Sequence, residues 1–421
     1  MVTVEDITKL YIAMFGRAPE GEGLDYWYQQ ALANDWDITQ LATNMYYAAI
    51  QYEDYAFLAD PLKLVESIYE NVLGKTYADD PEGINYWVGQ IKSGIIPPGE
   101  VARVIIETAE NQYPDHPATK TLHNRVEVAL YTAQKIPKFT GDFEAFKDFI
   151  GIVDDDSLTI QFAEKNVDKY WEQVKEEAVE TADAVSEGFL WISQEISSVG
   201  YLARESLALY KISGSSDVGF WSIEPENDGL KIAFDDFYYD YGSYYIEGIV
   251  KANEVSDTDF KVDVLQPLVI SRGFLTTQIM GGAEIYYQDS QPIDSWVAQL
   301  SGETDYDTVD VGTRFDFEAE NVTMFANNEQ FDFKEIKGYV DFYGSTFKIQ
   351  GITLFEGEEY SFKASGDYSG NFNLELQDAY GNSLEVHWAD VNGNEILDTG
   401  DYLSASFDGE DISNILYDYL S

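Results

Sequence analysis

Residues 63–110 read KLVESIYENVLGKTYADDPEGINYWVGQIKSGIIPPGEVARVIIETAE and predict three helices separated by two breaks. Apolar residues recur at helical spacing before Gly74, which ends the first helix because glycine tolerates the left-handed cap conformation. Asp80 and Pro81 are typical cap and first-turn residues of the second helix. A Pro-Pro pair then breaks the chain before a third helix, residues 100–110.

The same layout occurs earlier, in residues 9–27, KLYIAMFGRAPEGEGLDYW. The aligned positions are Tyr11 with Tyr69, Gly16 with Gly74, Gly23 with Gly83, and Tyr26-Trp27 with Tyr86-Trp87. Because an internal repeat fixes the architecture of its region, we expect two related helical units, about 1–58 and 59–112. Aromatic residues at this spacing are usually core residues, and ligand stacking is the alternative.

These residues resemble a family of helical modules of unknown function with the pattern G-R-x-P followed by G-L-x-Y-W. The match is close in 64–110 and good in 9–32, and residues 122–133, LHNRVEVALYTA, look like a segment that often follows the module. The module is common in bacterial type I-secreted and surface-layer proteins, so the resemblance implies export and a cell-surface location. It covers roughly the first third of the chain and offers no catalytic residues. Lys75 departs from the pattern, where arginine is common.

The chain is strongly acidic: 77 Asp and Glu against 25 Lys and Arg give a formal net charge of -52 over 421 residues. Phosphate contacts need the opposite sign, so we expect no nucleic acid partner. Anionic lipid surfaces would also repel the chain unless a cation bridges them. The charge itself opposes compaction, and divalent cations or salt would relieve it. A generic acidic secreted or salt-adapted protein is the plain alternative explanation.

The chain contains no cysteine, which excludes disulfides, thiol catalysis and cysteine-based metal sites. The first residues, MVTVEDITKLYIAMFG, lack the basic and apolar regions of a secretory signal peptide. No apolar run reaches the length of about 20 residues that a membrane-spanning helix needs. We therefore expect a soluble protein without membrane insertion, exported by a route such as a C-terminal type I signal, or numbered from a processed end.

The fold class predicted is a multidomain α+β protein, with an all-helical N-terminal domain followed by an antiparallel β-rich, sandwich-like C-terminal domain. After further helices in 111–155, Ser157 caps a helical pattern that runs to about Ile212, with kinks or ends expected at Gly188 and Gly200. Beyond Ser213 the chain alternates apolar and polar residues between Gly, Asn and Asp turns. The domains are thus 1–212 and 213–421, the second forming a sandwich or a long meander.

A weaker repeat lies within the β-rich part. Residues 240–249 resemble residues 343–352 after one insertion, which is compatible with two related β units, about 217–300 and 314–405. Chance similarity between hairpins is the alternative.

The sharpest functional motif is DVNGNEILDTGD, residues 390–401. Read as a twelve-residue calcium loop, it supplies oxygen ligands at the positions such loops use. The candidate ligands are Asp390, Asn392, Asn394, the main-chain carbonyl of Ile396, Asp398 and Asp401. The loop resembles those of dockerins, but Glu395 replaces the usual glycine and Asp401 is shorter than the usual bidentate glutamate. An acidic hairpin turn is the alternative.

Other candidates are less specific. The acidic groups 154–156, 257–259 and 303–310 are read mainly as solvated turns, although the last two could join calcium sites. The aromatic run 237–245 could stack on sugars or pack in a core. The three histidines are far apart, and no HExxH, GxSxG or P-loop motif occurs. A glycosidase needs only two carboxylates, but nothing selects a pair. We expect no enzyme.

The sequence thus predicts a bacterial, extracellular, calcium-dependent structural protein that assembles into a homo-oligomeric surface layer or filament. In this hypothesis, calcium neutralises carboxylates and triggers assembly outside the cell. The helical domain would serve anchoring or export, with a surface polysaccharide or lipopolysaccharide as a possible anchor. A secreted monomeric adhesin or carbohydrate-binding protein is the first alternative, and a secreted hydrolase of unrecognised type is the second.

Overall fold

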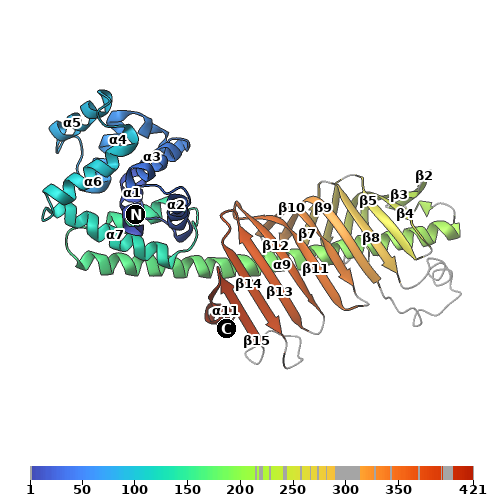
Figure 1. Ribbon diagram of the computed structural model, residues 1–421. Coiled ribbons are helices and arrows are strands. Elements are labelled where there is room, and N and C mark those ends of the chain that lie inside the picture. Colours follow the sequence, from blue (N-terminus) through green and yellow to red (C-terminus); the bar gives the residue numbers. More distant parts are fainter. Residues whose placement is uncertain are drawn as a thin grey trace. The chain divides into compact units, whose positions relative to one another are not determined.

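The computed structural model gives the fold of this chain (Figure 1). It describes residues 2–420 except 214–215, 218–220, 227–228, 240–243, 257, 266, 273–274, 281, 290–312, 327–328, 342–343, 368–369, 390 and 392–401. The chain divides into two compact units, residues 1–174 and 175–421. The first is helical and the second is built on an antiparallel sheet, which confirms the predicted fold class.

The helical unit contains short helices connected by tight turns. They are α1 (Val4–Phe15), α2 (Gly21–Ala33), α3 (Ile38–Ala49), the 3₁₀ turns η1 (Glu53–Ala59) and η3 (Pro98–Glu100), α4 (Pro61–Ile68), the π-helical turn η2 (Tyr69–Leu73), α5 (Pro81–Lys92), α6 (Val101–Gln112), α7 (Pro117–Lys135), α8 (Phe143–Gly151) and the start of α9 (Leu158–Ser213). Residues 9–27 and 63–110 therefore share one order of elements, in which a helix, a glycine turn and a second helix follow one another.

Both copies of the repeat end their first helix on a left-handed glycine. Gly16 has φ 66° and Gly74 has φ 62°, so the predicted cap at Gly74 is confirmed. Asp80 caps α5 by accepting a hydrogen bond from the Gly83 amide, with Pro81 in the first turn, also as predicted. The aromatic residues are core residues in part: Tyr69 is buried, and its hydroxyl accepts a hydrogen bond of 3.0 Å from the Trp87 indole.

Arg17, directly after the first glycine cap, is held by hydrogen bonds and by aromatic rings. It is 8% exposed. Its guanidinium donates to the Tyr11 hydroxyl (2.8 Å), the Ala18 carbonyl (2.9 Å) and the Glu20 carboxylate (2.8 Å). The rings that surround it, with centroids 5.0–5.7 Å from its Cζ, are Tyr11, Phe139, Phe143 and Phe146. Arg17 thus joins the α1–α2 turn to α8 through cation–π and charge-assisted contacts.

Helix α9 runs unbroken over Leu158–Ser213, close to the predicted span. Its start is fixed by the acidic turn before it, where the Asp156 carboxylate accepts a hydrogen bond from the Leu158 amide (3.0 Å). The expectation of a kink or end at Gly188 was wrong. A glycine is present there because a Cβ would come within 3.1 Å of the Phe333 ring. The helix continues through Gly200 as well.

The described strands of the second unit join in one antiparallel sheet. They are β1 (Ser216–Asp217), β2 (Trp221–Glu226), β3 (Gly229–Tyr239), β4 (Tyr244–Glu254), β5 (Asp259–Val264), β6 (Leu268–Arg272), β7 (Leu275–Ile279), β8 (Ala283–Asp289), β9 (Thr313–Ala326), β10 (Glu329–Asp341), β11 (Thr346–Phe355), β12 (Glu358–Asp367), β13 (Asn371–Asp378), β14 (Ser383–Ala389), β15 (Tyr402–Phe407) and β16 (Glu410–Asp411). Helix α11 (Ser413–Leu420) follows the last strand.

The strand order is largely the chain order, as in a meander. The path is β1-β2-β3-β4-β5-β8-β9-β10-β11-β12-β13-β14-β15-β16. Between β4 and β9 the sheet is built from four short strands in place of two long ones. β5 pairs with one half of β4 and β6 with the other half. On the other side, β8 and β7 pair with the two halves of β9. The two segments that resemble each other are described over residues 244–249 and 344–352. In both, this part includes the start of the second strand of a hairpin whose first strand carries a bulge.

One face of the sheet, which we call the inner face, packs on α9 around Phe189 (Figure 1). Phe189 is fully buried and stacks on Phe362 with ring centroids 5.5 Å apart. Apolar residues alternate along the strands to reach this face, as in the buried–intermediate pattern of β5. The layer opposite the sheet is therefore a helix, not the second sheet of a sandwich. Within the described residues, no helix is long and apolar enough to span a membrane.

Candidate functional site

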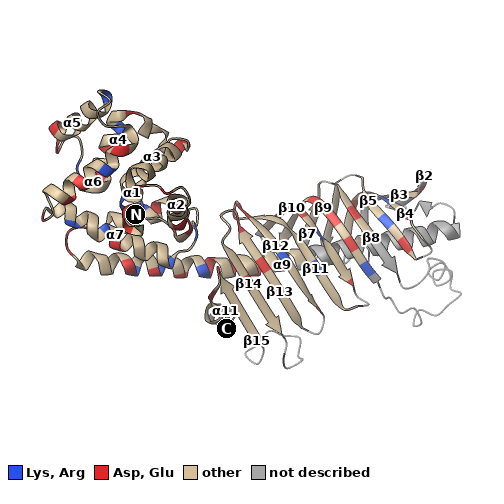
Figure 2. Cartoon of the chain, in the orientation of Figure 1, with Lys and Arg blue, Asp and Glu red and all other residues tan. Residues whose placement is uncertain are grey.

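The opposite face of the sheet, here called the outer face, carries polar side chains at the positions that alternate with the buried core. All seven lysines that follow residue 213 lie on strand positions of this face. They are Lys231, Lys251, Lys261, Lys334, Lys337, Lys348 and Lys363. In a chain with a net charge of -52, this gathers scarce positive charge on one surface, next to acidic side chains on the same strands (Figure 2).

Strand pairing aligns ten of the outer-face side chains in one line across the sheet, here called the charged row. Each member is directly opposite the next in the register of adjacent strands. From β3 to β14 its members are Lys231, Lys251, Asp263, Glu284, Glu318, Lys337, Gln350, Lys363, Glu375 and Glu385. Neighbouring members lie one strand spacing apart, about 4.8 Å.

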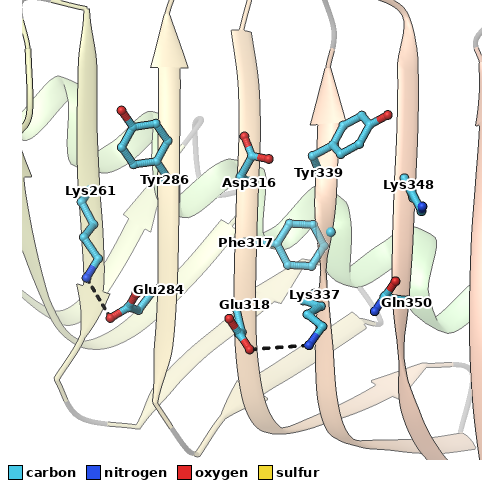
Figure 3. A pocket seen from close by; sticks show the side chains of 11 residues that line it. Lys261, Glu284, Tyr286, Asp316, Phe317, Glu318, Lys337, Tyr339, Lys348 and Gln350 are labelled. Carbon is cyan, nitrogen blue, oxygen red and sulfur yellow. Dashed lines mark ion pairs between the residues drawn. The ribbon is translucent and has the colours of Figure 1, made fainter.

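A second line of side chains, the tyrosine row, runs beside the charged row. It contains Lys261, Tyr286, Asp316, Tyr339, Lys348 and Ser365 on β5, β8, β9, β10, β11 and β12. Figure 3 shows part of both rows: Glu284, Glu318, Lys337 and Gln350 of the charged row beside Lys261, Tyr286, Asp316, Tyr339 and Lys348 of the tyrosine row.

Ion pairs link the two rows and neighbouring strands. The Lys261 ammonium lies 2.9 Å from Asp263 and 2.8 Å from Glu284, and these hydrogen bonds raise the lysine's pKa (Figure 3). The Lys363 ammonium lies 2.7 Å from Glu375. Because exposed ion pairs contribute only about 0–1 kcal/mol each to stability, folding alone gives little reason for this arrangement.

The outer face is hollowed along the charged row. A shallow groove of about 530 Å³ lies over β5 to β11, a second of about 390 Å³ over β10 to β14, and a third of about 410 Å³ over β13 to β16. The first two share Lys337 and Gln350, and the last two share Glu375 and Glu385, so they form one continuous trough. Such a trough suits an extended partner better than a small molecule, which needs an enclosing pocket.

The six predicted calcium ligands, Asp390, Asn392, Asn394, Ile396, Asp398 and Asp401, lie outside the described residues. Their flanks are described. Residues 390–401 connect β14 to β15, whose last and first residues, Ala389 and Tyr402, are paired in the sheet. The residues on either side of the candidate loop are therefore held side by side, which is compatible with a loop that ligates through its first and last residues.

The remaining predicted sites have ordinary structural roles where they are described. Asp154 and Asp156 form the capped turn before α9, as expected. His116 caps α7 through Nδ1, His123 pairs with Glu110 (3.0 Å), and His387 contacts Asn373 (2.7 Å). Asp257 and residues 303–310 lie outside the described part, which elsewhere contains no group of three or more potential metal ligands.

Sequence reasoning missed the charged row. Its signal was present as lysines and acids at alternate positions of apolar strands, for example Lys261 and Asp263 around Val262. The row depends, however, on the register of every strand pair, which the pattern of one strand does not specify.

Comparison with known proteins gives one partial similarity. Residues 55–114, which contain the second helical repeat, match the model of a family described as a domain of unknown function (DUF4214). Neither the curated proteins nor the solved structures gave a match to the chain.

Proposed function

We propose that the chain is a non-enzymatic structural subunit that associates with copies of itself through the outer face of its sheet in the presence of calcium. The observation that carries this proposal is the charged row, an extended polar surface that crosses the strands from β3 to β14. From β5 onward this surface is hollowed into the trough described above. A surface of this size suits a macromolecular partner.

Charge supports a cation requirement. Two copies with a net charge of -52 each repel one another at long range, and a divalent cation reduces this repulsion. The candidate calcium loop begins next to β14, the strand that holds Glu385 at the end of the charged row. The resemblance of the helical repeats to modules of secreted and surface-layer proteins supports assembly outside the cell, where calcium is abundant.

Calcium should therefore control the association state. In chelator we expect a monomer by light scattering, and with millimolar calcium we expect dimers or larger assemblies. Replacing Asp390 and Asp401 by alanine should raise the calcium concentration needed for association at least about tenfold, because affinity follows the number of charged ligands.

The matched control is a double replacement of Asp115 and Asp148 by alanine, which removes the same charge from exposed positions of the helical unit. It should leave the calcium requirement unchanged. A wild-type chain that remains monomeric in both conditions would contradict the proposal.

Glycan binding is the second candidate because Tyr286 and Tyr339 line the trough beside charged and amide side chains. Flat aromatic rings next to hydrogen-bonding groups are suited to sugar rings. In this case the monomer would be retained on an acidic or neutral polysaccharide, and replacing both tyrosines by alanine would abolish retention.

A further inference from the structure

We infer that the outer face is its own partner: two copies pair face to face, with the strand order of one reversed relative to the other. The two-fold axis runs parallel to the strands, between β9 and β10. This inference rests on the proposed self-association and specifies the surface and the register.

The order of charges along the row carries the inference. From β3 to β14 the row reads Lys, Lys, Asp, Glu, Glu, Lys, Gln, Lys, Glu, Glu. When a second copy is rotated by a two-fold axis through the middle of the row, the first member of one copy faces the last member of the other. The second member then faces the ninth, and the remaining members pair in the same way toward the middle. The five contacts are Lys231–Glu385, Lys251–Glu375, Asp263–Lys363, Glu284–Gln350 and Glu318–Lys337. Four join opposite charges, one joins glutamate to glutamine, and none joins like charges.

Other registers of the charged row are worse. A shift by one strand in one direction places Lys251 opposite Lys363 and Glu318 opposite its own copy. A shift in the other direction places Asp263 opposite Glu375 and Lys337 opposite its own copy. A two-fold axis perpendicular to the strands, along the row, would place every charged residue opposite the same residue of the other copy. Since like-charge contacts suppress wrong partners, the row selects a single register.

The neighbouring rows largely agree with this register. On the tyrosine row, Tyr286 meets Lys348 and Asp316 meets Tyr339, which permits a cation–π contact and a hydrogen bond. Farther out, Arg314 meets Asp341. Two acidic contacts arise on the flanking rows, Glu320 with Glu335 and Asp259 with Asp367, and divalent cations or salt would screen both.

Geometry also permits the pairing. Rotation about an axis parallel to the strands preserves the handed twist of the sheet and keeps the strands of both copies aligned across the interface. Ten strands at about 4.8 Å spacing and three outward residues per strand cover roughly 43 Å by 20 Å. That is about 860 Å² per copy, against about 800 Å² per partner in a standard interface.

Charge reversal at one contact tests the register. Lys363 is exposed (65%) and lies on β12. Asp263 lies on β5, five strand spacings away, so the two residues of one chain are roughly 24 Å apart. Lys363→Glu alone, or Asp263→Lys alone, should raise the dimer dissociation constant at least about tenfold in millimolar calcium, measured by sedimentation velocity. Combined, they should restore association to within about threefold of wild type, because opposite charges again meet between chains.

The matched control is Lys63→Glu in the helical unit. Lys63 is similarly exposed (60%) and also pairs with a glutamate, but it lies outside the sheet. It should leave association unchanged, and circular dichroism should report a native fold for every variant. If wild type associates but Lys363→Glu associates equally well, or the double variant is not rescued, the pairing is wrong while self-association stands. If wild type never associates, both fail.

Discussion

Replacing Arg17 by alanine is expected to lower the free energy of unfolding of the helical unit by about 3–5 kcal/mol. The guanidinium is buried among four aromatic rings and donates to Tyr11, Ala18 and Glu20. Its loss leaves the Glu20 side chain, only 13% exposed, without the cation that neutralises it. The cost is therefore that of an uncompensated charge, in addition to the lost packing.

The internal repeat supplies the control for this prediction. Lys75 occupies the aligned position after Gly74 and is half-buried. Lys75→Ala should change stability by no more than about 0.5 kcal/mol. Urea unfolding of the full chain, with hydrogen exchange of peptides from α1 and α8, assigns the change to the helical unit. Equal effects of the two substitutions would show that the aromatic cluster around Arg17 does not support the fold.

Replacing Phe189 by alanine is expected to destabilise the sheet unit by about 3–5 kcal/mol. The ring is fully buried between α9 and the inner face and stacks on Phe362, with Phe372 also nearby at 6.4 Å between centroids. Removing it leaves a cavity that the rigid strands on one side and the helix on the other cannot close.

Phe162, on the same helix but 60% exposed, is the control. Phe162→Ala should change stability by no more than about 0.5 kcal/mol. Hydrogen exchange of peptides from β12 and β13 should accelerate in the Phe189 variant and remain at the wild-type rate in the Phe162 variant. Unchanged protection in both would mean that α9 is dispensable to the sheet.

The helical part of the fold could be predicted in detail because its signals are local. Gly74 and Asp80 act through their own backbone and the next turn, so their sequence context decides their structure. The start of α9 was also placed correctly, but the side chain that accepts a hydrogen bond from the Leu158 amide is Asp156, whereas Ser157 had been predicted as the cap. The role of Gly188 was predicted wrongly because the glycine is explained by a residue far away in the sequence, Phe333, whose ring approaches it closely.

The sheet could be predicted only as strands. Alternation along a strand such as 259–264 shows that one face is buried, but it does not show what covers that face. In the structure, Phe189 of α9 covers part of that face by stacking on Phe362. The charged row needed the pairing of many strands, so no local pattern revealed it.

The most direct test of outer-face association is chemical crosslinking, which the absence of natural cysteines makes selective. We would replace Asp263 and Lys363 by cysteine, together and singly, and treat each protein with a short bis-maleimide in millimolar calcium. Cα atoms of facing residues in two stacked sheets lie about 10 Å apart, whereas these two lie roughly 24 Å apart within one chain. Covalent dimers from the double variant, and few from either single variant, are the predicted result. Failure of the double variant to crosslink, or equal dimer yields from the single variants, would contradict the account.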